Sequence, residues 1–213
     1  MTEKKKEPLI IVLSAPSGSG KTTLTIKLAK HYGWNAELEA VEKNPYLADF
    51  YEDMKRWSFH LQVYFLNSRF NQIKRIRESA ESVIQDRTIY EDAYIFAANL
   101  HKSKMISDRD YENYLNLFHS MINFVKAPDL LVYLKADIPK LVGQIEKRGR
   151  HYENSIRIDY LKNLNAHYED WISNYDKGKL LVVDVNDLDF VTHPEDFANI
   201  VQRIDREIYG LFA

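Results

Sequence analysis

The segment "PLIIVLSAPSGSGKTTL", residues 8–24, joins an apolar run to a loop rich in glycine and serine. Gly20, Lys21 and Thr22 match the end of the pattern G-x-x-x-x-G-K-[ST], whose backbone N–H groups surround phosphate oxygens. An amphipathic segment follows, and Gly33 stands where a helix would end. The segment therefore predicts a strand, a phosphate-binding loop and a helix whose positive end faces the phosphates.

The loop implies roles for individual side chains. Lys21 is expected to pair with the outer phosphates of a nucleotide, and the Thr22 hydroxyl is expected to bind Mg²⁺. Ala15 occupies the first glycine position of the pattern, which narrows the allowed backbone angles there. A chance Gly/Ser turn is the alternative, which the flanking patterns disfavour. The residues expected to bind the phosphates are Ser17, Gly18, Ser19, Gly20, Lys21, Thr22 and Thr23.

Composition and charge exclude several classes of protein. The 213 residues suit one domain over residues 1–213. The 29 Lys and Arg residues nearly balance 31 Asp and Glu residues, so neither nucleic acid nor a membrane is an expected partner. No stretch has the length of a transmembrane helix, and the apolar run near the start is too short for a signal peptide. Cysteine is absent, which excludes thiol catalysis. Together, the composition and the expected lack of a signal or membrane segment predict a cytoplasmic protein.

Apolar runs alternate with longer helical patterns. The runs typical of buried strands are residues 9–14, 35–40, 82–86, 130–134 and 180–185, of which 35–40 is the weakest. Helical patterns lie near residues 21–32, 54–78, 89–101, 107–126, 138–148, 156–174 and 194–209. This alternation predicts an α/β fold with a parallel sheet covered on both faces, whose ligands bind at the carboxyl ends of the strands.

Two segments place polar groups where such a ligand would bind. Glu39 is expected at the end of the second strand, where it can act as a general base, although a solvated glutamate is the simpler interpretation. Gln62, Phe65 and Arg69 share one face of the expected helix 54–78. An amide, a ring and a guanidinium suit a flat heteroaromatic ligand; burial in the core is the alternative for Phe65.

Two further segments carry charge. In "QDRTIYEDAYIF", Asp86 and Arg87 follow the third strand. Asp92 and Phe96 share a face of the next helix, although an acid pair at its N-terminus is an equally simple interpretation. In "EKRGRHYE", residues 146–153, the arginines can close over phosphates or merely end a helix.

The order of these motifs resembles bacterial deoxynucleoside kinases of the deoxyadenosine/deoxyguanosine/deoxycytidine kinase family. The resemblance covers nearly the whole chain and rests on "GSGKTTL", "LEAVEKNPYLADFYED", "RWSFHLQVYFLNSRF", "QDRTIYEDAYIF", "PDLLVYL", "RGRHYE" and "LVVDVNDLDF". It implies a P-loop kinase fold with a five-stranded parallel sheet, helices on both faces and a short lid near residues 146–155. The implied activity is ATP-dependent phosphorylation of the 5′-hydroxyl of a 2′-deoxynucleoside in salvage, with deoxyadenosine ahead of deoxyguanosine or deoxycytidine.

The resemblance also implies roles at the reacting centre. Glu39 matches the glutamate that deprotonates the 5′-hydroxyl, and Arg87 matches the arginine that holds the 5′ oxygen and the incoming phosphoryl group. Asp86 would help Thr22 hold Mg²⁺, beside Lys21.

Further matches surround the base. Gln62 matches the amide that pairs with the base, and Phe96 matches the ring that stacks on it. Arg69 and Asp92 match the pair that reads the exocyclic group. Leu61 stands where some relatives have phenylalanine, which implies a looser pocket wall.

Other matches concern the sugar and the donor. Tyr51 and Glu153 match the pair that grips the sugar 3′-hydroxyl, and Arg148 and Arg150 match the lid arginines. The loop around the donor adenine corresponds to residues 184–190, with Asp187 and Phe190 as its contacts.

Two other functions and the assembly stay open at this stage. A nucleoside monophosphate kinase of thymidylate kinase type shares the loop and the Asp-Arg strand end, but needs no base at Glu39. A non-catalytic structural subunit should have lost some of Lys21, Glu39 or Arg87, and all are present. The resemblance implies a homodimer through the helices near 89–101 and 107–126; the aromatic residues that fit either that interface or the core are Tyr111, Tyr114 and Phe118.

Overall fold

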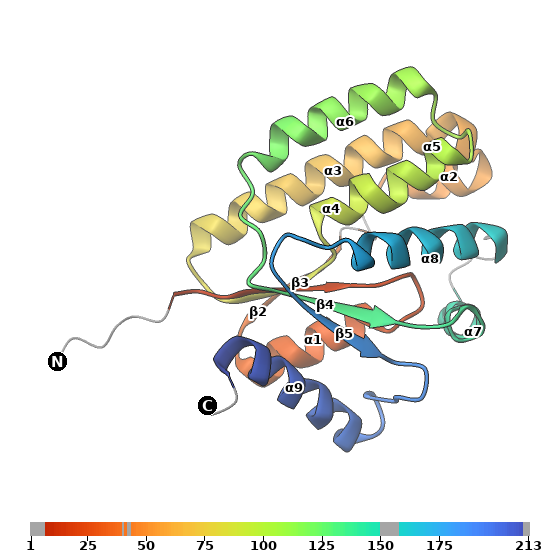
Figure 1. Ribbon diagram of the computed structural model, residues 1–213. Coiled ribbons are helices and arrows are strands. Elements are labelled where there is room, and N and C mark those ends of the chain that lie inside the picture. The colour runs from red at the N-terminus through yellow and green to blue at the C-terminus, as the bar shows by residue number, and fades with distance from the viewer. Residues whose placement is uncertain (1–6, 40, 42–43, 150–157, 211–213) are drawn as a thin grey trace.

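A parallel sheet forms the centre of the computed structural model, which describes residues 7–39, 41, 44–149 and 158–210 (Figure 1). The strands are β1 (Ile10–Ser14), β2 (Asn35–Glu37), β3 (Val83–Asp86), β4 (Leu130–Lys135) and β5 (Lys179–Asp184). Their spatial order is β2-β3-β1-β4-β5, and every pair is parallel. The five-stranded parallel sheet expected from the apolar runs is thus confirmed.

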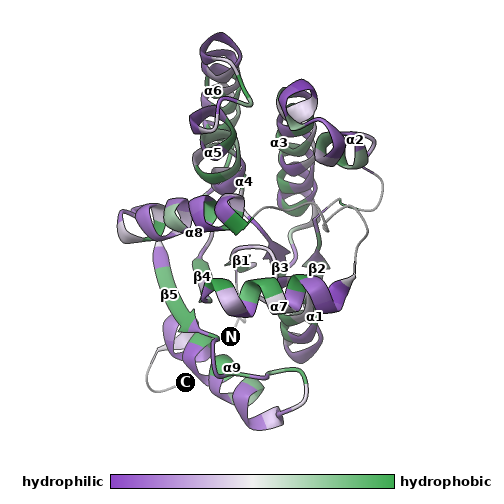
Figure 2. Ribbon diagram, turned by 90° about the vertical axis from the view of Figure 1, so that its right-hand side faces the viewer, coloured by the Kyte–Doolittle hydropathy of each residue, from purple (hydrophilic) through white to green (hydrophobic). Residues whose placement is uncertain are grey.

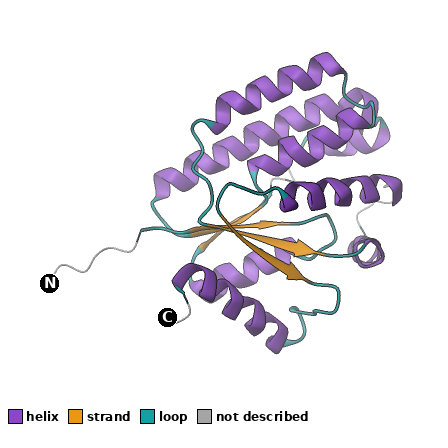
Figure 3. Cartoon of the chain, in the orientation of Figure 1, coloured by secondary structure: helices purple, strands orange, loops and turns teal. Residues whose placement is uncertain are grey.

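Helices cover both faces of this sheet (Figures 1 and 3). On one face lie α1 (Lys21–Tyr32) and α9 (Pro194–Tyr209). The other face carries α3 (Met54–Ser79), α6 (Asp108–Ile122) and α8 (Ile158–Ser173). Another helix, α7 (Ile138–Arg148), lies near the ends of the strands. No helix in the described part of the chain is both long and apolar enough to cross a membrane.

The core explains why the apolar runs become central strands. Residues 130–134 of β4 are all at most 1% exposed, because helices shield both sides of the sheet. Figure 2 shows β4 and β5 as largely hydrophobic, whereas α6 and α9 also carry hydrophilic residues. Leu24 and Leu28 of α1 pack with Ile200 and Ile204 of α9 in the cluster beneath the sheet. Burial of such side chains contributes roughly 1.5–3 kcal/mol each.

The strand register brings three loops together. Leu13 of β1 pairs with Asp86 of β3, and Glu37 of β2 pairs with Gln85. Because all strands are parallel, the phosphate loop after β1, Glu39 after β2 and the residues after β3 meet at one edge of the sheet.

Several elements differ from the expectation. The strand expected over 35–40 ends at Glu37, so Glu39 lies in the loop beyond it. A short helix, α2 (Leu47–Glu52), was not expected, since six residues are too few to show a helical period. The single helix expected over 89–101 consists of three consecutive parts, namely α4 (Ile89–Glu91), the π-helix η1 (Asp92–Ala97) and α5 (Ala98–Lys102).

The aromatic residues of α6 mostly belong to the core. Tyr114 is 1% exposed and Phe118 is fully buried, packed with Leu66 and Tyr90. Tyr111 is half-buried. The suggestion that Tyr114 and Phe118 form a dimer surface is therefore wrong, because these rings fill the space between α6, α3 and α4.

Candidate active site

The phosphate loop connects β1 to α1, and two of its glycines are required by its geometry. Gly18 and Gly20 have φ angles of 93° and 85°, in the left-handed region that favours glycine. A Cβ on Gly18 would lie 2.6 Å from the carbonyl oxygen of Leu141. Ala15 does not share this requirement, since the non-glycine residues with positive φ in the described part of the chain are Ala80, Arg87 and Lys104. The departure from the pattern at Ala15 thus leaves the loop geometry intact.

Phe190 supports this loop from behind. Its side chain is 5% exposed, and a Cβ on Gly20 would lie 2.8 Å from the tip of its ring. Asp187 is exposed in the segment that follows β5. The Lys140 ammonium donates to the carbonyl of Asn186 at 2.7 Å and so holds this segment against α7. Contact of Phe190 and Asp187 with a donor adenine stays a prediction; in this structure the Phe190 ring belongs to the core.

A cavity of about 840 Å³ opens at the carboxyl ends of the strands. It extends from the phosphate loop to α3, and its size suits a site for small molecules. The residues that were expected in the site and line this cavity are Ser17, Gly18, Ser19, Gly20, Lys21, Thr22, Thr23, Glu39, Tyr51, Gln62, Phe65, Asp86, Arg87, Asp92, Phe96 and Arg148. Gln144, Lys147 and Tyr160 line it as well and were not expected. Arg150 and Glu153 lie outside the described residues.

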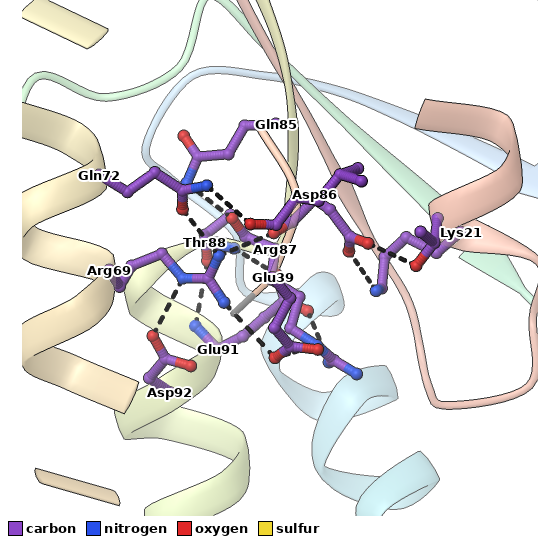
Figure 4. Close-up of polar contacts among 12 residues, drawn as sticks. Lys21, Glu39, Arg69, Gln72, Gln85, Asp86, Arg87, Thr88, Glu91 and Asp92 are labelled. Carbon is purple, nitrogen blue, oxygen red and sulfur yellow. Dashed lines mark hydrogen bonds and ion pairs between the residues drawn. The ribbon is translucent and has the colours of Figure 1, made fainter. Parts of the chain in front are cut away.

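Asp86 links the two functional side chains of the loop. Its carboxylate forms an ion pair with the Lys21 ammonium, and its Oδ2 accepts a hydrogen bond from Thr22 Oγ1 at 2.6 Å (Figure 4). Burial alone would raise the pKa of Asp86, but Lys21 and Arg87 lower it below the ordinary value. The carboxylate is therefore ionised and able to bind a cation beside the loop.

Arg87 is held in a strained backbone conformation. Its φ angle is 74°, which costs a non-glycine residue about 1–2 kcal/mol. Its backbone N–H donates to Leu13 O at 2.9 Å, and its carbonyl accepts from Gln85 Nε2 at 2.8 Å. Its guanidinium lies 4.6 Å from the centre of the Phe96 ring. Strain of this kind occurs at functional sites, where the surroundings enforce it.

Glu39 lies between two buried arginines. Its Oε1 is 3.0 Å from Arg87 Nε and 3.5 Å from Arg69 Nη2. Burial tends to raise the pKa of Glu39, but Arg87, Lys21 and Arg69 together lower it. The carboxylate is thus ionised at neutral pH and can accept a proton from a bound hydroxyl.

Arg69 lies behind the cavity wall rather than on its surface. It is 3% exposed, and its Nε is 3.3 Å from Asp92 Oδ2, which confirms the expected ion pair. Its Nη1 donates to Asp86 O at 2.8 Å and to Gln72 Oε1 at 3.0 Å. These acceptors hold the guanidinium in place, and of the two partners Asp92 lines the cavity whereas Arg69 does not.

The pKa of Asp92 is shifted upward. Burial, with smaller contributions from Glu39 and Glu91, raises its pKa to about 6, although Arg69 acts in the opposite direction. Asp92 opens the π-helix η1, an element often found at functional sites. The Gln62 amide oxygen is buried and has no hydrogen-bond partner in the described part of the chain, so it can pair with a ligand.

Gln72 is a supporting residue that the sequence patterns did not reveal. Its Nε2 donates to Glu37 Oε2 and to Leu38 O, both at 3.1 Å, and so holds the chain just before Glu39. The sequence feature that could have revealed this role is the position of Gln72 three residues after Arg69, on the same helical face.

Comparisons with known proteins agree with this geometry. The family described as "Deoxynucleoside kinase" matches residues 11–209. A "Deoxyadenosine/deoxycytidine kinase" from Bacillus subtilis is 40% identical over 203 residues, covering 94% of this chain and 93% of the relative. A "Deoxyguanosine kinase" from Lactobacillus johnsonii is 38% identical, covering 92% and 90%. A solved structure of deoxyadenosine kinase from M. mycoides with bound dATP has 29% identity and a TM-score of 0.82, covering 92% of this chain and 99% of that one. The chain belongs to the deoxynucleoside kinase family.

Proposed function

We propose that this deoxynucleoside kinase prefers deoxyadenosine as acceptor, accepts deoxyguanosine or deoxycytidine as well, and uses ATP with Mg²⁺ as donor. The observation that carries the proposal is the ionised Glu39 carboxylate, paired with Arg87 in the cavity that begins at the phosphate loop. A neutral hydroxyl acceptor needs such a base, whereas the acceptor phosphate of a thymidylate kinase is already ionised.

In the proposed reaction, the 5′-hydroxyl proton moves to Glu39 as the 5′ oxygen forms a bond to the γ-phosphorus of ATP. The bond from that phosphorus to the ADP oxygen breaks. Lys21, Arg87 and Arg148 offset the negative charge of the transferring group, which is the main requirement of phosphoryl transfer. Arg150 is proposed to act with Arg148, and Glu153 to bind the sugar 3′-hydroxyl with Tyr51.

The donor set beside the loop fits Mg²⁺. Thr22 Oγ1 and Asp86 Oδ2 are hard oxygen donors 2.6 Å apart. Mg²⁺ is usually bound by one or two protein oxygens together with substrate phosphates and water, so a larger acidic cluster is not required. Within the described ranges, no group of three or more His, Cys, Asp or Glu residues is placed so that it could hold a metal ion. Bound there, Mg²⁺ would supply charge neutralisation to the donor phosphates.

Two grounds support this order of acceptors: the first favours bases that carry an exocyclic amino group, and only the second places deoxyadenosine first. The Asp92 carboxylate lines the cavity and can accept a hydrogen bond from an exocyclic amino group, while it repels a carbonyl oxygen. Relatives named deoxyadenosine/deoxycytidine kinase and deoxyadenosine kinase are 40% and 38% identical to this chain. A relative named deoxyguanosine kinase is also 38% identical to this chain, so sequence identity ranks the purine nucleosides only weakly. The preference for an amino group is therefore the stronger part of the proposal.

A substrate panel tests this proposal. Deoxyadenosine, deoxyguanosine, deoxycytidine, thymidine and dTMP are assayed with ATP and Mg²⁺, and kcat/KM is determined for each. We expect deoxyadenosine to give the highest value and thymidine one at least about tenfold lower, because unpaired buried polar groups penalise the wrong base. Turnover of dTMP above that of every nucleoside would overturn the proposal.

The pKa of Asp92 leads to a pH prediction. Above pH 6 the carboxylate is ionised and repels the thymine carbonyl; below pH 6 it gains a proton and can donate to that oxygen. The deoxyadenosine-to-thymidine ratio of kcat/KM should therefore fall, by about tenfold, between pH 7.5 and pH 5.5. The Asp92→Ala variant should show the low ratio at both pH values.

This comparison uses Asp92 alone, because a change at Arg69 would also disturb Glu39. Each ratio of kcat/KM is formed from two substrates assayed at the same pH, so a general loss of activity with pH cancels out of it. A wild-type ratio that is constant over this range, or an Asp92→Ala ratio equal to the wild-type ratio at pH 7.5, would refute the role of Asp92.

We also propose a cytoplasmic location, where ATP is available, and a homodimer. Leu117 of α6 and Phe124, which follows the end of α6, are 39% and 65% exposed and would be covered in that dimer. Sedimentation as a monomer at assay concentration would contradict the dimer.

A further inference from the structure

The Arg87 guanidinium has a second set of contacts, on the side away from Glu39. Its Nη1 donates to Tyr168 Oη at 2.7 Å, and the same hydroxyl donates to Glu91 Oε1 at 2.9 Å. Arg87 is 4% exposed, and Tyr168 and Glu91 are fully buried. Tyr168 comes from α8, far from β3 in the sequence, so the contact joins a distant helix to the reacting centre.

Glu91 is itself fixed by its own helix. Its Oε2 accepts from Thr88 N at 2.7 Å, and its backbone N–H donates to Thr88 Oγ1 at 3.0 Å, which forms a capping box at the start of α4 (Figure 4). The carboxylate therefore cannot move toward Arg87 without losing a helix cap.

The Tyr168 hydroxyl fills the gap between these two charges. Arg87 Nη1 and Glu91 Oε1 are 3.5 Å apart, too far for a strong hydrogen bond, and the hydroxyl accepts from one and donates to the other. Burial raises the pKa of Tyr168 well above its ordinary range, so the hydroxyl stays protonated.

We propose that Tyr168 and Glu91 are positioning residues, which hold the Arg87 guanidinium at the reacting centre. This inference rests on the proposed role of Arg87. Among the described residues, the other acceptors near Nη1 are the carbonyl of Ala15 at 3.4 Å and Glu91 itself, and both lie beyond ideal distance. Without the hydroxyl, the guanidinium shifts toward these acceptors and loses its alignment with Glu39 and the transferring phosphoryl group.

The test is Tyr168→Phe, with Tyr133→Phe as the matched control. The two rings stack at 5.9 Å, and both are at most 1% exposed. Tyr133 Oη instead donates to Glu169 at 3.0 Å. Each variant loses one hydroxyl and keeps its ring, so packing changes alike. We expect Tyr168→Phe to lower kcat about tenfold or more, since small misplacements of a reacting group are costly. KM for deoxyadenosine and for ATP should change less than threefold, and Tyr133→Phe should retain wild-type kcat.

Arg87→Ala distinguishes a failure of the proposed role of Arg87 from a failure of the positioning role of Tyr168 and Glu91. If Arg87→Ala keeps the wild-type kcat, the proposed role of Arg87 is wrong. If Arg87→Ala is inactive while Tyr168→Phe matches Tyr133→Phe, the positioning role is wrong and the proposed function stands. A rise in KM with unchanged kcat in Tyr168→Phe would also overturn the positioning role.

Glu91→Gln provides a second route, which serves if Tyr168→Phe does not fold. The glutamine oxygen can still accept from Thr88 N, but its NH₂ group cannot accept from the Tyr168 hydroxyl. We expect Glu91→Gln alone to lower kcat by about tenfold or more. Where Tyr168→Phe does fold, the double variant should show little further loss, because both changes break one chain of contacts. Full activity of Glu91→Gln, or losses that multiply in the double variant, would contradict the proposal.

Discussion

Glu39→Gln is expected to lower kcat about 10²- to 10⁴-fold, the usual contribution of a general base. The amide has the size of the carboxylate but cannot accept the 5′-hydroxyl proton. Glu39 lies in the loop after β2 and is 18% exposed, so the exchange leaves the core intact. Steady-state assays with deoxyadenosine and ATP should show the loss in kcat, with KM for deoxyadenosine within about threefold of the wild-type value.

Glu78→Gln is the matched control for this prediction. Glu78 lies on α3, is 65% exposed and pairs only with Lys74 among the contacts of the described residues. The same chemical change there should leave kcat unaltered. A Glu39→Gln variant that keeps more than half of the wild-type kcat would show that Glu39 is not the base.

Arg87→Ala is expected to lower kcat about 10²- to 10³-fold, as the loss of a preorganised charge-stabilising donor does elsewhere. The change also removes the foremost of the three cations that lower the pKa of Glu39. Lys21→Ala provides a contrast, because Lys21 is a residue of the phosphate loop that we propose pairs with the donor phosphates. That variant should raise KM for ATP as well as lower kcat. If Arg87→Ala raised only KM for ATP, a place for Arg87 at the reacting centre would be excluded.

Arg87→Gly controls for the strained backbone. Both Arg87→Ala and Arg87→Gly lose the guanidinium and should lose kcat alike. At a φ of 74°, glycine relieves strain of about 1–2 kcal/mol, against an extra chain entropy of about 0.4–1 kcal/mol. Thermal or denaturant unfolding should therefore show Arg87→Gly to be the more stable variant, by up to about 1.5 kcal/mol. Equal kcat losses with this difference in stability would assign the catalytic effect to the side chain.

The fold could be predicted from the sequence because its signals are local. Buried strands such as 130–134 are continuous apolar runs, and the pattern that ends in Gly20 and Lys21 specifies a strand, a loop and a helix within a few residues. The short α2 and the end of β2 at Glu37 could not be predicted, since too few residues are involved for a period to show.

That the proposed catalytic residues lie together could also be predicted, although they come from separate segments. Parallel strands bring their carboxyl ends to one edge, so Lys21, Glu39 and Arg87 had to meet once the strands were recognised. Their detailed partners could not be derived in this way. The ion pair of Arg87 with Glu39 depends on a left-handed residue after β3, which no local pattern announces for arginine.

The sequence by itself therefore determined the parallel sheet, the phosphate loop and most of the polar residues that meet at the carboxyl ends of the strands. Only the tertiary structure decided how those residues are held. It placed Arg69 behind the cavity wall, Phe190 beneath the phosphate loop, and Tyr168 of α8 between Arg87 and Glu91. The physical reason is that periodicity and motif spacing report on contacts within an element, whereas a buried guanidinium finds its partners among whichever acceptors the packed helices bring near it.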